Sequence, residues 1–104
     1  MTGRPERARL LVVDDDGAVV DYLVDALGDE GYRVTGLTSP QRALQELTEG
    51  EYDLVIADVE MPEMRGPELM AAIHARRPIQ LVLLVTAFGS IETGLTHSAL
   101  QHLV

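Results

Sequence analysis

Short apolar runs alternate with segments of helical periodicity along this chain. The runs Leu10–Val13, Leu54–Ala57 and Leu81–Val85 are uninterrupted, which is typical of strands buried on both faces of a parallel sheet. Arg33–Leu37 is a weaker run that predicts one more strand. Between the strands, apolar residues recur at helical spacing and predict three helices. The first helix is expected to start at Asp16 and to end at Gly31, and the second to start at Ser39-Pro40 and to end at Gly50. The third is expected to start at Pro67 and to be closed by Pro78.

The order of these elements is βαβαβαβ followed by a tail. It predicts an α/β domain with a doubly wound parallel sheet and helices on both faces. Polar residues follow three of the strands: Asp14 and Asp15, then Asp58, then Thr86. Ligands of open α/β sheets bind outside the carboxyl ends of the strands. We therefore expect these side chains to converge on one site.

Composition narrows the class of protein. The 104 residues fit a single small domain, and 46% of them are hydrophobic, enough for a core. A formal net charge of −9 disfavours direct binding to nucleic acid. The absence of cysteine excludes disulfides, thiolate metal sites and cysteine nucleophiles. No apolar run is long enough to cross a bilayer and no signal peptide is recognisable, so a cytoplasmic location without membrane contact is expected.

The three clustered carboxylates predict a metal site. Two like charges about 4 Å apart repel by roughly 4 kcal/mol at an effective dielectric constant of 20, so a proton or a cation must relieve them. Hard oxygen ligands favour Mg²⁺, which commonly binds carboxylates together with phosphate oxygens. Asp58 stands alone at its strand end and is the candidate nucleophile for an aspartyl phosphate. The Thr86 hydroxyl is a candidate hydrogen-bond donor to the phosphoryl oxygens.

Other polar residues have simpler interpretations. An aspartate near a strand or helix end is more often a cap or a turn former than a functional group, and we interpret Asp16 and Asp53 in this way. His74 is expected on the outer, solvated part of its helix. His97 and His102 are five residues apart, which is not the spacing of a helical metal pair.

Three segments together resemble response-regulator receiver domains. Leu11–Asp16 resembles their first strand and acid pair, and Tyr52–Gly66 closely resembles their phosphoacceptor segment. Val85-Thr86-Ala87 resembles the family's switch threonine and the small residue after it. The resemblance covers roughly residues 8 to 95. Within it, Thr86–Thr93 is similar to the nitrogen-regulatory subfamily, whose receivers usually precede ATPase and DNA-binding domains.

The resemblance implies a flavodoxin-like fold and a phosphoryl-transfer reaction. The family's strand order is 2-1-3-4-5. A sensor histidine kinase, a phosphotransfer protein or a small phosphodonor would phosphorylate Asp58. Asp15, Asp58 and the backbone carbonyl of Glu60 would coordinate Mg²⁺, with Asp14 contributing through water. Thr86 would then move toward the phosphate and change a protein-interaction surface.

This module is not expected to be a conventional turnover enzyme. Phosphatases with an aspartate nucleophile need a second acid two residues later and usually a lysine. Glu60 occupies that second position, but the sequence contains no lysine. A phosphorylation-independent pseudo-receiver, acting as a dimerisation or interaction module, is the alternative function.

The C-terminal part departs from the family pattern. Receivers carry a fifth strand that ends in a lysine, which contacts the phosphoryl group, and neither is recognisable here. The expected organisation is an N-terminal arm at 1–7, a receiver domain at 8–93 and a divergent tail at 94–104. The sheet order becomes 2-1-3-4, with the fifth strand missing or replaced by the tail. The chain is then a piece of a longer protein, a degenerate receiver, or a receiver whose tail improvises a replacement.

The missing strand has a physical consequence. Leu81–Val85 is left as an exposed apolar sheet edge, which invites pairing with another chain. A homodimer or a strand-swapped assembly is therefore expected. The tail that follows fits either a short strand at Ala99–Val104 or a helix with Ile91, Leu95, Ala99 and Leu103 on one face, and periodicity does not decide between them.

Overall fold

All four predicted strands and three predicted helices are present in the computed structural model, which describes residues 7–85. Four expected bounds shift by a single residue, as is common at element ends. The elements, in chain order, are β1 (Arg9–Val13), α1 (Gly17–Asp29), β2 (Arg33–Leu37), α2 (Pro40–Glu49), β3 (Leu54–Asp58), α3 (Gly66–Arg76) and β4 (Val82–Val85). The predicted tail at 94–104, and with it the replacement for a fifth strand, lies outside the described residues.

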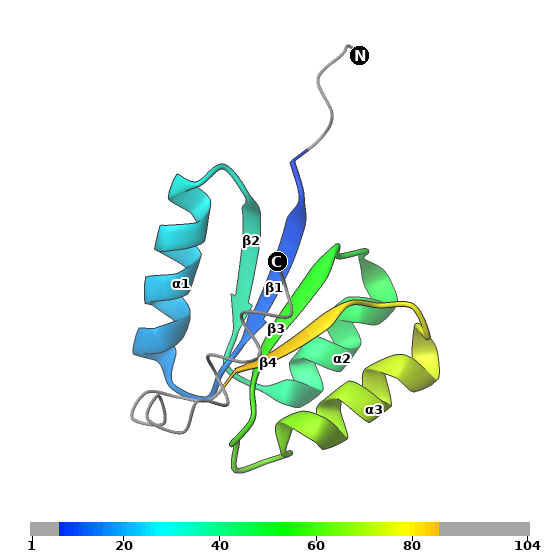
Figure 1. The fold of residues 1–104 in the computed structure, drawn as a ribbon. Coiled ribbons are helices and arrows are strands. Elements are labelled where there is room, and N and C mark those ends of the chain that lie inside the picture. The colour runs from blue at the N-terminus through cyan, green and yellow to red at the C-terminus, as the bar shows by residue number, and fades with distance from the viewer. Residues whose placement is uncertain (1–6, 86–104) are drawn as a thin grey trace.

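The strands form one parallel sheet in the order β2-β1-β3-β4, as predicted. β1 is central, and Val13 pairs with Leu37 of β2 on one side and with Ala57 of β3 on the other. On the far side of β3, Asp58 pairs with Val85 of β4. Figure 1 shows α1 against one face of the sheet and α2 and α3 against the other. In the described part of the chain, β2 and β4 are the two edges.

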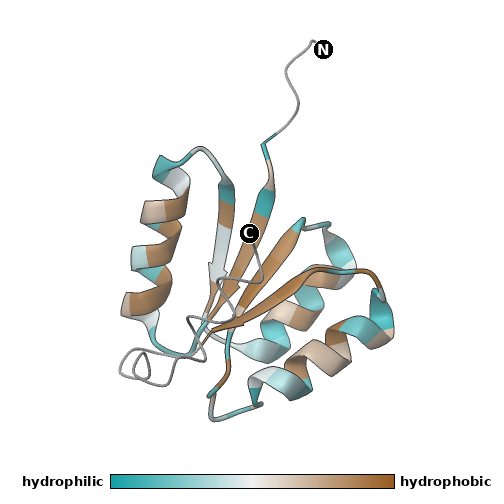
Figure 2. Cartoon of the chain, in the orientation of Figure 1, coloured by the Kyte–Doolittle hydropathy of each residue, from teal (hydrophilic) through white to brown (hydrophobic). Residues whose placement is uncertain are grey.

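The main core lies between the sheet and the pair α2 and α3. Side chains alternate along each strand, so that one set faces this core and the next set faces the α1 side. β1, β3 and β4 are largely hydrophobic, whereas β2 is mostly of intermediate hydropathy (Figure 2). The buried residues of the core cluster are Leu11, Val13, Ala43, Leu47, Tyr52, Val55, Ala57, Met61, Leu69 and Ile73.

The helix ends follow the predicted signals. The Asp16 side chain accepts a hydrogen bond from the Ala18 backbone N–H at 2.9 Å and caps α1. Ser39 Oγ accepts from the Arg42 N–H at 3.3 Å and caps α2. Gly31 has φ of 102°, in the left-handed region that favours glycine, and it follows the end of α1. These local contacts set the ends of the helices that connect β1 to β2 and β2 to β3.

The prediction for His74 is wrong. Its side chain is half-buried, and Nε2 lies 2.8 Å from the backbone oxygen of Gln80. The turn after α3 folds back against the helix and buries Gln80, so His74 is held by a contact rather than solvated.

No helix within residues 7–85 combines the length and the apolar character that a membrane span requires.

Candidate functional site

The acidic site forms because β1 and β3 are parallel neighbours. Both strands run toward the same edge of the sheet, so the residues at their carboxyl ends meet there. Asp14 and Asp15 follow the last residue of β1, and Asp58 is the last residue of β3. The predicted convergence of these three side chains is therefore present.

The three carboxyl groups are close enough to share one cation. Asp14, Asp15 and Asp58 each offer an oxygen, and these oxygens all lie within 4.8 Å of one another. Asp14 is 5% exposed and Asp58 is 3% exposed, whereas Asp15 is open to solvent. The cluster thus combines two buried carboxyl groups with one that is accessible to solvent.

Backbone amides fix the two buried carboxyl groups. The Asp16 N–H donates to Asp14 Oδ1 at 2.9 Å, and the Glu60 N–H donates to Asp58 Oδ1 at 3.1 Å. Each bond ties a carboxylate to the chain two residues ahead and restricts its rotation. The residues after β1 and β3 therefore orient the site as well as connect the elements.

Burial makes these carboxyl groups costly to ionise. Desolvation, opposed by the amide of Asp16 and aided by the charge of Asp58, raises the pKa of Asp14 from 3.8 to about 6. The pKa of Asp58 is also raised, chiefly by burial, with the charge of Asp15 adding to it. A divalent cation would remove this penalty. The donor set, hard oxygens at mutual contact distance, fits Mg²⁺.

Glu60 is not part of the carboxylate cluster, and Thr86 falls outside the residues that the structure describes. The Glu60 side chain is exposed and its carboxylate lies 3.8 Å from Arg65, so it is outside the carboxylate cluster. The backbone N–H of Glu60 donates a hydrogen bond to Asp58 Oδ1, and the charge of the Glu60 side chain adds to the raised pKa of Asp58. Thr86 lies outside the described residues, although β4 ends beside β3 at Val85, opposite Asp58.

Gly66 supports the site in a way that sequence reasoning missed. A Cβ atom on Gly66 would lie 2.7 Å from the backbone oxygen of Asp58 and 2.8 Å from Val59 Cα. The Gly66 N–H also donates to the Val59 oxygen at 2.8 Å. The start of α3 therefore packs directly on the backbone of the acidic residue. A glycine just before Pro67 at a helix start was the available signal for this close approach.

Asp16 and Asp53 have the structural roles predicted for them. Asp16 caps α1. Asp53 lies at the opposite end of β3 from Asp58, and its Oδ2 accepts a hydrogen bond from the Arg9 N–H at 2.7 Å. Neither residue belongs to the carboxylate cluster.

The sequence matches the family described as response regulator receiver domain over residues 10–102. Transcriptional regulatory protein ZraR of Escherichia coli K12 is 39% identical over 98 residues, which cover 91% of this chain and 22% of ZraR. Response regulator protein FleR of Pseudomonas aeruginosa is 39% identical over 85 residues, 82% of this chain and 18% of FleR. The chain spans about a fifth of the length of these curated relatives.

Solved receiver structures share the fold. Response regulator TrrA of Thermotoga maritima, in complex with Mg²⁺ and BeF, superposes with a TM-score of 0.74 at 34% identity. That likeness covers 88% of this chain and 80% of TrrA. TrrA in complex with the histidine kinase ThkA gives a TM-score of 0.74 at 33% identity, covering 88% of this chain and 79% of that chain.

Proposed function

Because this chain belongs to the response regulator receiver domain family, we propose that it is a phosphoacceptor module of a two-component system and that Asp58 takes up the phosphoryl group. The observation that carries the proposal is the meeting of Asp14, Asp15 and Asp58 within 4.8 Å at the ends of two adjacent strands. This intact cluster supports phosphorylation over the alternative, a pseudo-receiver that works without it. Phosphorylation of Asp58 would then change a surface through which the domain binds other proteins.

In the proposed reaction, a carboxylate oxygen of Asp58 attacks the phosphorus of the donor. The bond between phosphorus and the donor atom breaks, and an aspartyl phosphate forms. The Glu60 amide, 3.1 Å from Asp58 Oδ1, holds the carboxyl group in one rotation. The Thr86 hydroxyl would hydrogen-bond the phosphoryl oxygens. The module turns over no separate substrate.

Mg²⁺ is the proposed cofactor. Asp15, Asp58 and the backbone carbonyl of Glu60 would hold the ion, and Asp14 would contribute through water. When bound, the ion neutralises charge on the phosphoryl oxygens. The exposed carboxylate of Asp15 leaves the metal position open to solvent.

The direct test is labelling of the full chain with acetyl phosphate. In the presence of Mg²⁺ we expect the intact mass to rise by one phosphoryl group, and chelation of the metal should prevent the increase. Labelling that proceeds equally without a divalent cation would contradict the metal assignment. Failure to label under any condition, with the fold verified by circular dichroism, would instead favour the pseudo-receiver.

The proposed phosphodonor partner is a sensor histidine kinase or a phosphotransfer protein. TrrA, a relative with the same fold, is described in complex with such a kinase. The kinase would have to bring its phosphohistidine to the edge of the sheet where Asp58 lies.

A second copy of the chain is a further proposed partner, through the edge of β4. β4 is an edge strand in the described residues, and Leu81 just before it is 65% exposed. Unpaired backbone groups on an apolar edge strand favour pairing with another strand. We expect the molar mass from light scattering to rise with protein concentration toward that of a dimer. A constant monomer mass across the concentration range would rule this assembly out.

A further inference from the structure

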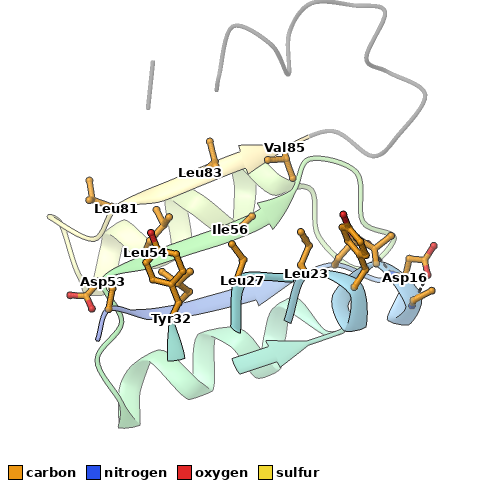
Figure 3. Close-up of a pocket in the computed structure, with 16 residues that line it drawn as sticks. Asp16, Leu23, Leu27, Tyr32, Asp53, Leu54, Ile56, Leu81, Leu83 and Val85 are labelled. Carbon is orange, nitrogen blue, oxygen red and sulfur yellow. Dashed lines mark hydrogen bonds between the residues drawn. The ribbon is translucent and has the colours of Figure 1, made fainter. Parts of the chain in front are cut away.

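The position of α1 above the sheet depends mainly on its contact with β2. Within residues 7–85, α1 packs chiefly against β2 and to a smaller extent against β1. Over β3 and β4, a cavity of about 1070 Å³ lies beside the helix. Figure 3 shows this cavity, with Leu23 and Leu27 of α1 on one side and Ile56 of β3 on the other. The distance between α1 and the sheet is therefore set where the helix crosses β2.

Gly36 of β2 is the position at which α1 comes this close. A Cβ atom on Gly36 would lie 2.4 Å from Val20 Cγ1 and 2.8 Å from Val24 Cγ2. Carbon atoms in ordinary contact are about 3.5–4.0 Å apart, so a side chain here would push the helix away by roughly 1 Å. Val20 has little room to turn aside, because it is buried and a valine in a helix has one strongly preferred rotamer.

Hydrogen bonds connect this contact to the acidic site. The Val20 N–H donates to the Asp16 oxygen at 3.1 Å, and the Asp16 N–H donates to Asp14 Oδ1 at 2.9 Å. The Asp14 N–H donates in turn to the oxygen of Leu37, the residue after Gly36, at 3.2 Å. The packing contact and the three hydrogen bonds form a closed ring. The distance of α1 from β2 therefore sets the position of the acidic turn that follows β1.

We propose that Gly36 is a positioning residue of the acidic site, and that its missing side chain holds the turn after β1 in a position that favours Mg²⁺ over Ca²⁺. This inference rests on the proposed function, in which the three acids hold a metal ion. Mg²⁺ requires near-ideal octahedral geometry at about 2.0–2.1 Å, whereas Ca²⁺ accepts flexible coordination at about 2.3–2.6 Å. A displacement of roughly 1 Å at the turn would therefore weaken binding of Mg²⁺ much more than binding of Ca²⁺.

Calorimetric titration of the full chain with Mg²⁺ and, separately, with Ca²⁺ tests this preference. In Gly36→Ala we expect the ratio of Mg²⁺ affinity to Ca²⁺ affinity to fall at least about tenfold. A smaller folded fraction would lower both affinities alike, so the ratio separates positioning from stability. Gly28→Ala is the matched control, because Gly28 is exposed on α1 and an added Cβ would have no atom within 4 Å. An unchanged ratio in Gly36→Ala would overturn the proposal.

Shortening the two valines tests whether the effect passes through α1. In the background Val20→Ala with Val24→Ala, the methyl groups that a Cβ at position 36 would meet are gone, and Val20 Cβ would lie 3.9 Å away. Gly36→Ala should change the affinity ratio less than about twofold in this background, since the interaction between the two positions has been removed. Circular dichroism verifies that each variant is folded. A tenfold fall in this background as well would refute a role through the helix contact.

Amide hydrogen exchange in the metal-free full chain follows the turn without any ion. In Gly36→Ala the Asp16 N–H should exchange at least about tenfold faster, because its bond to Asp14 Oδ1 is disturbed. The Glu60 N–H, bonded to Asp58 Oδ1 at the end of β3, should keep its rate. Equal acceleration of both amides would contradict a positioning role. If the unmodified chain binds neither ion, the proposed metal site fails, whereas the exchange rates still decide whether Gly36 positions the turn.

Discussion

Asp58→Asn is expected to abolish labelling by acetyl phosphate, to below about one hundredth of the unmodified rate, because the amide cannot act as the nucleophile. The substitution preserves size and leaves an oxygen to accept the hydrogen bond from the Glu60 N–H. Intact-mass spectra over a time course give the measurement. The fold should be retained, since asparagine removes a buried charge rather than adding one.

The matched control for this variant is Asp53→Asn. Asp53 directly precedes the first residue of β3, at the opposite end of this strand from Asp58. Asparagine can still accept the hydrogen bond from the Arg9 N–H. Labelling should proceed at the unmodified rate in this control. Phosphoryl incorporation that persists in Asp58→Asn would show that another residue is the acceptor.

The metal-free protein is expected to lose stability as the pH rises from about 4 to about 6.5. Between the ordinary pKa of 3.8 and the folded-state pKa of about 6, folded Asp14 keeps a proton that the unfolded chain has released. Folding then takes up a proton, so the free energy of unfolding falls as pH increases through this window. The raised pKa of Asp58 acts in the same direction. The expected loss is on the order of 1–3 kcal/mol, from about 1.4 kcal/mol per pKa unit.

Urea unfolding at a series of pH values, with and without Mg²⁺, measures this loss. Mg²⁺ at pH 7 should restore stability, because it binds the folded site and not the unfolded chain. Asp14→Asn should remove the part of the pH dependence of the unfolding free energy that Asp14 causes. Asparagine can still accept the hydrogen bond from the Asp16 N–H. Asp21→Asn, a change at an exposed residue of α1, should behave like the unmodified chain. A pH profile that Asp14→Asn leaves unaltered would disprove the role of Asp14.

Local sequence signals predicted the elements because each one acts through neighbouring atoms. Asp16 and Ser39 cap helices through the amides of residues two and three positions later, and Gly31 adopts its left-handed conformation alone. The acidic site was equally predictable. Strand order follows from the βαβ alternation, and the carboxyl ends of parallel strands meet at one edge.

Contacts between distant segments could not be read from the sequence. Arg77 Nε donates to the Leu47 oxygen at 2.8 Å, and Arg77 Nη2 donates to the Gly50 oxygen at 3.2 Å. These bonds tie the end of α3 to the end of α2, whereas the sequence shows only a basic residue near a helix terminus. The contact of His74 with Gln80 was missed for the same reason, since it depends on how the turn after α3 folds back.

The close packing of Gly66 on the backbone of Asp58 leaves the main chain of Asp58 little independent freedom. The loop between them is closed by the bond from the Gly66 N–H to the Val59 oxygen, and the Val59 N–H is bonded in turn to the Val85 oxygen. A displacement of the Asp58 main chain would therefore be relayed both to the first turn of α3 and to the end of β4. A chemical change at the Asp58 carboxyl group is therefore coupled to the positions of both α3 and β4.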